Sequence, residues 1–458
     1  MSEFEAGARP LGGTEHSWCR AVPGGTGITV LAILLSRRPN FPVLQNALQE
    51  LQDAHPILSS KLHPSRTTGT FSFIPSSDPH VQIERISLSS TEDILKIPKQ
   101  SPSLFPFHLI IEHEFARNPW AEPEFSEAQL IFATAYELPD DKWAVVLRLH
   151  TGACDRTASA GLLREVLRLM ADGVTDGEIG SKVEGSLGTI EEYVPAGKAN
   201  KPFWARGKDM IGYSLNSFRL ANLNFVDVEQ PRSSQWVRLK FNPEVTNQFV
   251  SCCKSREIKL CGVLAAAGLI AARALKCIPN DQTSEKYAVV TLVDCRSELD
   301  PPLHANSVGF YHSAILNTHD IRGGEKLWEL AKRCYMSFAD AKKWNKHFTD
   351  MSDLNFLMCR AIENPGLTPS SSLRTSFISV FEDPIIDESN EKLKEIGLED
   401  YVGCASAHGV GPSLAIFDTI RDGSLDCACV YPAPLHSREQ MQELVDNMER
   451  IIVDGLNA

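Results

Sequence analysis

His150, Thr151, Cys154 and Asp155 place an imidazole, a hydroxyl, a thiol and a carboxylate within one short stretch of the chain. An imidazole can accept a proton near neutral pH, whereas a threonine hydroxyl cannot, so His150 is the first candidate for a general base. Cys154 is a nucleophile only as a thiolate, and no neighbouring base in the sequence would activate it. Two interpretations of the stretch stay open: His150 is either a catalytic base or a buried structural histidine, and Thr151 either binds a substrate or a water or packs simply as a small residue.

The same residues lie between a predicted strand and a predicted helix. Trp143–Leu149 is an apolar run of strand length that is rich in β-branched residues. From Thr157 to Met170 apolar residues recur at helical spacing, with Thr157 or Ser159 as the expected N-cap. Active-site groups often occupy such turns, because the rigid elements aim them while the loop leaves room for a ligand.

Composition limits the classes of partner. The net charge of −13 disfavours nucleic acid and anionic membranes, although a local basic pocket could still bind an anionic co-substrate. The twelve cysteines include no CxxC pair, so we expect free thiols and no metal site. The N-terminus has no apolar segment behind a basic start, and a cytoplasmic protein is therefore expected.

Predicted strands and helices alternate along the 458 residues, which indicates an α/β (α+β) fold with two similar halves. The joint between the halves is expected at about Ala199–Val228, giving domains of 1–205 and 206–458. The motifs GxGxxG, GxxxxGK[ST] and GxSxG are absent, which disfavours dehydrogenases, P-loop NTPases and α/β-hydrolases.

Four further elements are expected from local patterns. Phe105–Glu114 is predicted as a strand, Lys201–Asn224 as an amphipathic helix and Cys261–Cys277 as a buried helix. A hairpin is predicted across Asp422-Gly423.

Several stretches together resemble the superfamily of CoA-dependent acyltransferases. This superfamily includes nonribosomal peptide condensation domains, BAHD acyltransferases, alcohol acetyltransferases and polyketide-associated acyltransferases. Leu48–Leu62 (LQELQDAHPILSSKL) is similar to the condensation-domain helix that ends in HPxL, and RLHTGACDRTASAGLLREVL is similar to the HHxxxDG region. Arg296–Ile315 resembles a BAHD segment, and AHGVGPSLAIFDTIRDGSLDCACVYP resembles the final strands. The BAHD motif DFGWG is absent, so the condensation and alcohol acetyltransferase branches look closer.

The resemblance implies two chloramphenicol-acetyltransferase-like lobes that form a pseudo-dimer with a central channel. It places the HxxxD turn midway along that channel, with acyl donor and acceptor entering from opposite ends. It also implies acyl-CoA as co-substrate, no bound cofactor and a monomer.

The chain departs from the family at the catalytic base. In the family, the second histidine of HHxxxDG, four residues before the aspartate, is the general base. Asp155 matches the aspartate and His150 the first histidine, but Thr151 stands in place of the second. General-base assistance is worth roughly 10²–10⁴ in rate, so its loss has to be offset elsewhere.

The resemblance also implies roles for residues outside the turn. Asp155 would be mainly structural, paired with Arg296. His312, which stands where the family segment has its asparagine, and His408, beside small residues in SAHGVG, are possible substitute bases or channel residues.

Three functions remain open. The first is an acyltransferase of specialised metabolism that moves an acyl group, other than aminoacyl, from CoA to an alcohol or amine of a small molecule. The second is a repurposed enzyme that catalyses a CoA-independent cyclisation, isomerisation or elimination. The third is a non-catalytic binding protein.

Overall fold

The computed structural model describes residues 8–65, 69–96, 105–121, 128–172, 188–202, 207, 220–276, 278, 284–368, 372–388 and 391–457. The chain divides into two compact units. Unit 1 comprises Met1–Tyr193, Leu303–Tyr311 and Ser389–Ser406, and unit 2 comprises Val194–Pro302, His312–Glu388 and Ala407–Ala458. Compared with the predicted domains of 1–205 and 206–458, two segments of the second half therefore belong to unit 1.

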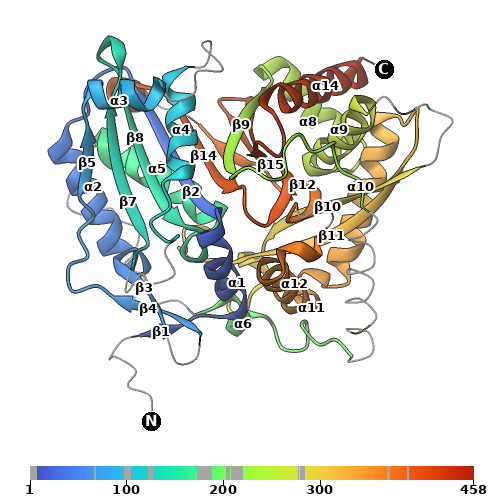
Figure 1. Cartoon of the computed structure of the whole chain (residues 1–458), viewed down its shortest axis with the longest axis horizontal. Helices are drawn as coiled ribbons and strands as arrows, with labels where there is room; N and C mark the ends of the chain where they lie inside the picture. The colour runs from blue at the N-terminus through green and yellow to red at the C-terminus, as the bar shows by residue number, and fades with distance from the viewer. Residues whose placement is uncertain are drawn as a thin grey trace. The chain divides into compact units, whose positions relative to one another are not determined.

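A five-stranded sheet organises unit 1, in the order β14-β2-β8-β7-β5 (Figure 1). Its strands are β2 (Thr26–Leu35), β5 (Ile83–Ile86), β7 (Ile131–Glu137), β8 (Trp143–His150) and β14 (Leu398–Ala407). The central strand β8 runs antiparallel to both β2 and β7, and all of its residues are buried. Because both of its neighbours are paired to it along most of their length, β8 is a rigid support for whatever follows His150.

The two faces of β8 differ in character. Leu147 and Leu149 point into an apolar cluster with helices α2 (Phe41–Ala54) and α5 (Arg156–Asp172). Arg148 points to the other face and pairs with the buried Glu114 of α4 (Pro106–Ala116). The helices of unit 1 are α1 (Gly13–Ala21), α2 (Phe41–Ala54), α3 (Leu88–Lys96), α4 (Pro106–Ala116), α5 (Arg156–Asp172), α6 (Ile190–Tyr193) and α13 (Glu391–Glu395). Its 3-10 turns are η1 (Val22–Gly24), η2 (Pro56–Ser59), η3 (Pro139–Asp141) and η4 (Thr151–Ala153).

A smaller sheet in unit 1 has the order β1-β4-β3-β6. Its strands are β1 (Arg9–Pro10), β3 (Ser60–Pro64), β4 (Phe71–Pro75) and β6 (Ala128–Gln129). Phe73 of β4 and Leu62 of β3 share a small apolar cluster with Ala153 of η4. This sheet therefore supports the turn after β8 from outside the main sheet.

Unit 2 is built on a seven-stranded sheet in the order β11-β10-β12-β15-β16-β9, with β13 paired to β15. Its strands are β9 (Ser233–Lys240), β10 (Glu285–Asp294), β11 (His312–Ile321), β12 (Arg374–Phe381), β13 (Ile385–Asp387), β15 (Gly411–Arg421) and β16 (Ser424–Ala433). Its helices and 3-10 turns are α8 (Pro243–Ser255), α9 (Leu260–Leu275), η5 (Arg296–Glu298), α10 (Leu327–Lys343), α11 (Lys346–Thr349), α12 (Met351–Glu363), η6 (Pro365–Leu367) and α14 (Arg438–Leu456).

The buried helix predicted for Cys261–Cys277 is confirmed as α9, which packs against α10 and α14, although Cys277 itself lies outside the described residues. The predicted hairpin is also confirmed, because β15 and β16 pair across Asp422-Gly423. Both turn residues have positive φ angles, 49° and 76°, as a two-residue hairpin turn requires.

The strand predicted for Phe105–Glu114 is wrong, since these residues form most of helix α4. Pro106 occupies the first turn, where a missing N–H costs no hydrogen bond. The buried residues Phe107, Ile110, Ile111 and Phe115 recur at helical spacing. The apolar run that suggested a strand is too short for periodicity alone to separate the two structures.

The helix predicted for Lys201–Asn224 lies mostly outside the described residues, since positions 203–206 and 208–219 are not described. Positions 220–224 are not helical. Ala221 and Leu223 nevertheless support the sheet of unit 2, since the N–H of Ala221 donates to the carbonyl of Lys286 at 2.7 Å and Leu223 is buried in the apolar core.

Three global features concern possible partners. Within the described ranges, no single helix is long and apolar enough to cross a membrane, and one bent pair, α8 with α9, meets the length and composition criteria together. The cysteines in the described part of the chain are free thiols. In that same part, no cluster of three or more His, Cys, Asp or Glu side chains could hold a metal ion.

Candidate functional site

The turn after β8 is closed by backbone hydrogen bonds. The N–H of His150 donates to the carbonyl of Leu130 at 3.0 Å, which fixes the end of the strand. η4 follows at once, and the N–H of Cys154 donates to the carbonyl of Thr151 at 3.0 Å. The strand, short turn and helix predicted around His150 are thus confirmed.

The His150 side chain is fully buried and is engaged by its own turn. Its Nδ1 accepts a hydrogen bond from the N–H of Gly152 at 3.0 Å, so the neutral ring carries its proton on Nε2. Among the described residues Nε2 has no partner, and the ring lies edge-on to Trp120 with centroids 5.1 Å apart. Burial lowers the pKa of His150 to about 3. The geometry therefore favours a structural role, and a catalytic role for His150 stays a prediction.

Thr151, at the position where the family has its base, is buried and shares a hydrogen bond with a second threonine. Its Oγ1 lies 2.7 Å from Oγ1 of Thr29 on β2, and either hydroxyl can donate. Gly27, two residues earlier, has a φ of +92°, and a Cβ there would lie 2.9 Å from Trp18 and 3.2 Å from Cβ of Thr151. The Thr29–Thr151 pair is therefore held closely from the β2 side.

Asp155 is the N-cap of α5. Its Oδ1 accepts from the N–H of Ala158 at 2.9 Å, and its carbonyl accepts from the N–H of Ser159 at 2.8 Å. The prediction that Thr157 or Ser159 caps this helix is thus wrong. A carboxylate at the N-terminus both satisfies an otherwise unpaired N–H and faces the positive end of the helix dipole.

Asp155 also holds the segment Leu303–Tyr311 in unit 1. Its Oδ2 accepts from the N–H of Tyr311 at 2.7 Å, while its own N–H donates to the carbonyl of Gly309 at 3.0 Å. The Tyr311 hydroxyl donates in turn to the carbonyl of Gly188 at 3.1 Å. A Cβ on Gly309 would lie 2.5 Å from the Tyr311 ring, so the close approach requires glycine. These contacts give Asp155 a positioning role in the turn.

Arg296 lies in unit 2, where it is buried in η5. Its backbone N–H and its Nη1 both donate to Oδ1 of Asp294, at 3.1 and 3.0 Å. Its pairing with Asp155 stays a prediction.

The two possible substitute bases also lie in unit 2. His312 is the buried first residue of β11, with its ring edge-on to Phe381 at 6.0 Å. His408 lies just after β14, with Nδ1 3.0 Å from Oγ of Ser234. Burial, followed by the charges of Arg374 and Arg232, lowers the pKa of His408 to about 4. Catalytic roles for both histidines stay predictions.

Sequence reasoning missed a carboxylate–histidine pair in unit 2. Nε2 of the fully buried His347 lies 3.2 Å from Oε2 of Glu298, and the hydrogen bond from His347 is the largest cause that lowers the pKa of Glu298 to about 2. Among the described residues Nδ1 of His347 has no partner. The two residues are 49 positions apart, so no local pattern could have joined them.

Comparisons with known proteins agree with the fold described above. The family model for the C-terminus of phthiocerol/phthiodiolone dimycocerosyl transferase matches residues 230–341. Polyketide synthase associated protein 5 from Mycobacterium tuberculosis is 18% identical with a TM-score of 0.66, covering 97% of each chain. TRI3 trichothecene 15-O-acetyltransferase from Fusarium sporotrichioides is 12% identical with a TM-score of 0.72, covering 98% of this chain and 95% of that one. The chain has the fold of the CoA-dependent acyltransferase superfamily.

This acyltransferase fold extends to domains of other chemistry. The epimerization domain from the third module of tyrocidine synthetase B is 12% identical with a TM-score of 0.62, covering 98% of this chain and 96% of that one. No curated protein matches the sequence. The superfamily resemblance and the mixed α/β class are therefore confirmed as fold.

Proposed function

We propose that the protein is an acyltransferase that moves an acyl group, other than aminoacyl, from a CoA thioester to an alcohol or amine of a small molecule. The observation that carries the proposal is the intact support of the turn: β8 ends at His150, and Asp155 caps α5 while it binds the backbone of Gly309 and Tyr311. The acyltransferase fold supports the same reaction class. We further propose a monomer of specialised metabolism in the cytoplasm, with acyl-CoA as co-substrate and no bound cofactor.

The proposed reaction has to proceed without an imidazole at position 151. The acceptor oxygen or nitrogen bonds to the thioester carbonyl carbon, the C–S bond breaks, and the acceptor proton leaves with the CoA sulfur as a thiol. Such substrate-assisted proton transfer replaces the general base by orientation, which can supply about 7–11 kcal/mol of barrier lowering. The Thr29–Thr151 hydroxyl pair would orient the acceptor, since either hydroxyl can donate or accept.

The first experiment measures CoA thiol release from acetyl-CoA and longer acyl-CoAs, with and without a panel of small alcohols and amines. Release that depends on the acceptor supports acyl transfer. If the protein neither binds nor consumes any acyl-CoA, the proposal fails.

His150→Asn separates the structural from the catalytic role of His150. The asparagine carbonyl oxygen can still accept from the Gly152 N–H, but it offers no imidazole. We expect CoA release by this variant to stay within about a factor of three of the unmodified protein, because a ring with a pKa near 3 contributes little as a base. A loss of 10²-fold or more in a folded variant would show that His150 is the base.

A CoA-independent rearrangement is the second candidate. Two features of the turn favour it: Thr151 stands where the family has its base, and Nδ1 of His150 already accepts a hydrogen bond from Gly152. The similar epimerization domain supports it as well, because its name gives an activity other than acyl transfer. Turnover of a metabolite without CoA binding in calorimetry would support it. Ligand binding without any turnover would support the third possibility, a non-catalytic binding protein.

A further inference from the structure

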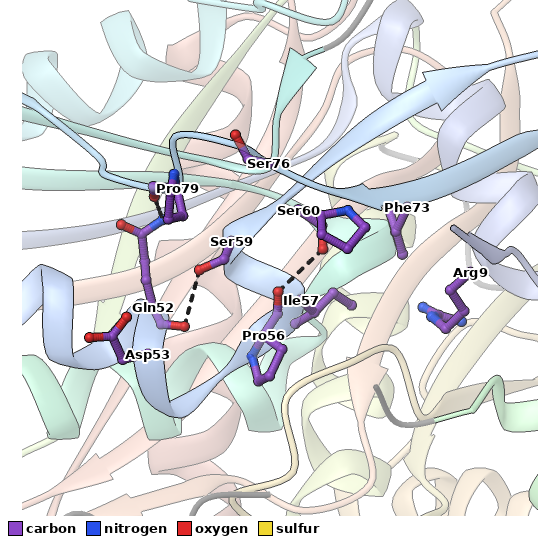
Figure 2. A pocket seen from close by; sticks show the side chains of 11 residues that line it. Arg9, Gln52, Asp53, Pro56, Ile57, Ser59, Ser60, Phe73, Ser76 and Pro79 are labelled. Atoms are coloured by element: carbon purple, nitrogen blue, oxygen red, sulfur yellow. Dashed lines mark hydrogen bonds between the residues drawn. The ribbon is translucent and has the colours of Figure 1, made fainter. Parts of the chain in front are cut away.

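Unit 1 has two features outside the His150–Asp155 turn that bear on ligand binding. One is a pocket of about 520 Å³ with Arg9 and Phe73 on one side and Gln52 on the other (Figure 2). Its main polar side chains are engaged within the protein, Gln52 by backbone groups and Arg9 by both carboxylate oxygens of Glu15. The pocket therefore favours no particular ligand chemistry.

The other feature is a pair of arginines at the end of the five-stranded sheet opposite to His150. Arg38 follows β2 and Arg85 lies on the edge strand β5, and both side chains are exposed. The guanidinium carbon of Arg85 lies 3.9 Å from the centre of the Phe41 ring, and that of Arg38 lies 5.5 Å from the same centre. Two positive charges from separate parts of the chain therefore converge on one aromatic ring.

Aromatic rings hold both guanidiniums in place. Phe41, the first residue of α2, packs against Trp143 with ring centres 5.3 Å apart, and both rings are buried. Arg38 also lies 5.9 Å from the centre of the Trp143 ring. A guanidinium over an aromatic ring is attracted to it. This attraction restrains two long side chains, so less conformational entropy is lost when they bind a ligand.

Neither guanidinium has a hydrogen bond or an ion pair within the part of the chain that the structure describes. Glu84, next to Arg85 on β5, pairs with Arg117 at 2.6 Å instead. Asp140 and Asp141, in the turn before β8, pair with neither arginine. In a chain with 58 acidic and 45 basic side chains, this pair is therefore a local excess of positive charge, and an anion between the two arginines would relieve their repulsion.

The geometry of the donors indicates which anion fits. Each guanidinium presents a planar fork of N–H groups that matches two oxygens of a carboxylate or a phosphate. A carboxylate has one pair of oxygens and one negative charge, so it satisfies one fork. A phosphate monoester has three terminal oxygens and up to two negative charges. Because both guanidinium carbons lie within 5.5 Å of one ring centre, such a group can reach both forks.

We propose that Arg38 and Arg85 bind a phosphate monoester, carried by a phosphorylated small molecule or by a lipid headgroup. Its terminal oxygens accept hydrogen bonds from both guanidiniums, and no covalent bond changes. The site is separate from the candidate site, because Trp143 and His150 are the first and last residues of β8, roughly 23 Å apart in a strand of that length. The binding therefore does not depend on acyl transfer.

The first measurement is a calorimetric titration of the full chain with phenyl phosphate and with benzoate, at equal ionic strength and a pH of about 8. We expect phenyl phosphate to bind at least about fivefold more tightly, because only the phosphate can pair with both forks. Added salt should weaken this binding, since exposed charges are screened. Absence of phenyl phosphate binding, or equal affinity for benzoate, would overturn the proposal.

Arg38→Gln and Arg85→Gln test the two residues, and Arg37→Gln is the matched control. Arg37 is exposed and carries the same charge, but its side chain lies beside Gly397, where an added Cβ would be 3.1 Å from Cγ of Arg37. We expect each of the first two variants to weaken phenyl phosphate binding about tenfold and the control to weaken it less than about twofold. Equal weakening by all three would show an effect of net charge alone and would overturn the site.

The conservative variants Arg38→Lys and Arg85→Lys keep the test decisive if a glutamine variant fails to fold. Each keeps the charge but lacks the fork, so we expect phenyl phosphate to bind about threefold more weakly. Unchanged affinity in both lysine variants would contradict binding by the two forks.

Vesicles distinguish the two sources of the phosphate. Co-sedimentation with phosphatidylcholine vesicles that contain phosphatidic acid, lost in Arg85→Gln, would assign the site to a lipid headgroup. Phenyl phosphate binding without vesicle binding would assign it to a phosphorylated small molecule. Phenyl phosphate binding that is undiminished in the double variant Arg38→Gln with Arg85→Gln would overturn the proposal for either source.

Discussion

Asp155 shows most clearly what a single residue does in this turn. It joins the N-terminus of α5 to the segment Leu303–Tyr311, because its Oδ1 accepts a hydrogen bond from the backbone of the helix and its Oδ2 accepts one from the backbone of the segment. Asp155 therefore has a structural function in the turn that does not depend on an imidazole at position 151. It fixes the turn and the segment relative to each other, and this role is independent of which group takes the proton of the acceptor.

Replacing Asp155 tests this positioning role. Asp155→Ala leaves the N–H groups of Ala158 and Tyr311 without acceptors, so we expect the free energy of unfolding to fall by about 2–4 kcal/mol. Asp155→Asn keeps one oxygen acceptor and should cost less. Urea unfolding measures both, and an Ala variant as stable as the unmodified protein would contradict the role.

Sequence reasoning could place Asp155 in a turn but not assign its bonds. Thr157 and Ser159 are equally good capping residues by type, and only the course of the chain decides between them and Asp155. For the same reason the His150–Gly152 and Thr29–Thr151 contacts were not foreseen, because each depends on the conformation of the turn or on the register of β2 with β8.

At the scale of elements, the start of β2 and the turn after β8 are fitted to each other. Gly27 has a backbone conformation that other residues rarely adopt, and Trp18 and Thr151 lie where its side chain would be. The position of Thr151 therefore depends on β2 as much as on its own strand.

Gly27→Ala tests this fit. The positive φ alone costs about 1–2 kcal/mol, and displacement of Trp18 or Thr151 adds to that, so we expect a lower melting temperature. Gly24→Ala is the matched control, since an added Cβ there meets nothing within 4 Å. Equal melting temperatures for the two variants would contradict the close packing of Gly27 against Trp18 and Thr151.

Elements were predictable where their pattern is long and local. The β8–turn–α5 stretch, the buried helix α9 and the hairpin across Asp422-Gly423 have patterns complete within one stretch of chain. Helix α4 was not recognised, because its apolar residues are nearly contiguous at the N-terminal end. The pocket in unit 1 could not be predicted from the sequence, since its lining runs from Arg9 to Pro79 across three strands, the end of a helix and a 3-10 turn.

At the scale of the whole molecule, buried histidines link stability to pH. Burial is the largest cause that lowers the pKa of His150 to about 3 and those of His319, His408 and His436 to about 4. Below pH 6.5 the unfolded chain binds protons at these positions and the folded protein does not. Their contribution to stability is therefore complete above pH 6.5 and is lost as the pH falls toward 3–4.

The urea midpoint should accordingly decrease from pH 7.5 to pH 5. Glu298, whose pKa is lowered to about 2 chiefly by the hydrogen bond from His347, adds a further loss between about pH 4.5 and 2. Glu15 has the opposite effect on the free energy of unfolding. Burial raises its pKa, so the folded protein binds this proton more readily than the unfolded chain and gains stability as the pH falls. A midpoint that is constant or rises from pH 7.5 to pH 5 would contradict the prediction for the histidines.

We propose that acyl transfer takes place at this turn, with Thr151 at the position where the resembling family has its general base. The most direct measurement compares acceptor-dependent CoA release by the unmodified protein and by Thr151→His, both checked for fold by circular dichroism. We expect the unmodified protein to release CoA slowly and Thr151→His to release it faster, toward the roughly 10²–10⁴-fold increase in rate that a general base supplies. A folded Thr151→His protein that binds acyl-CoA but releases CoA no faster would contradict it.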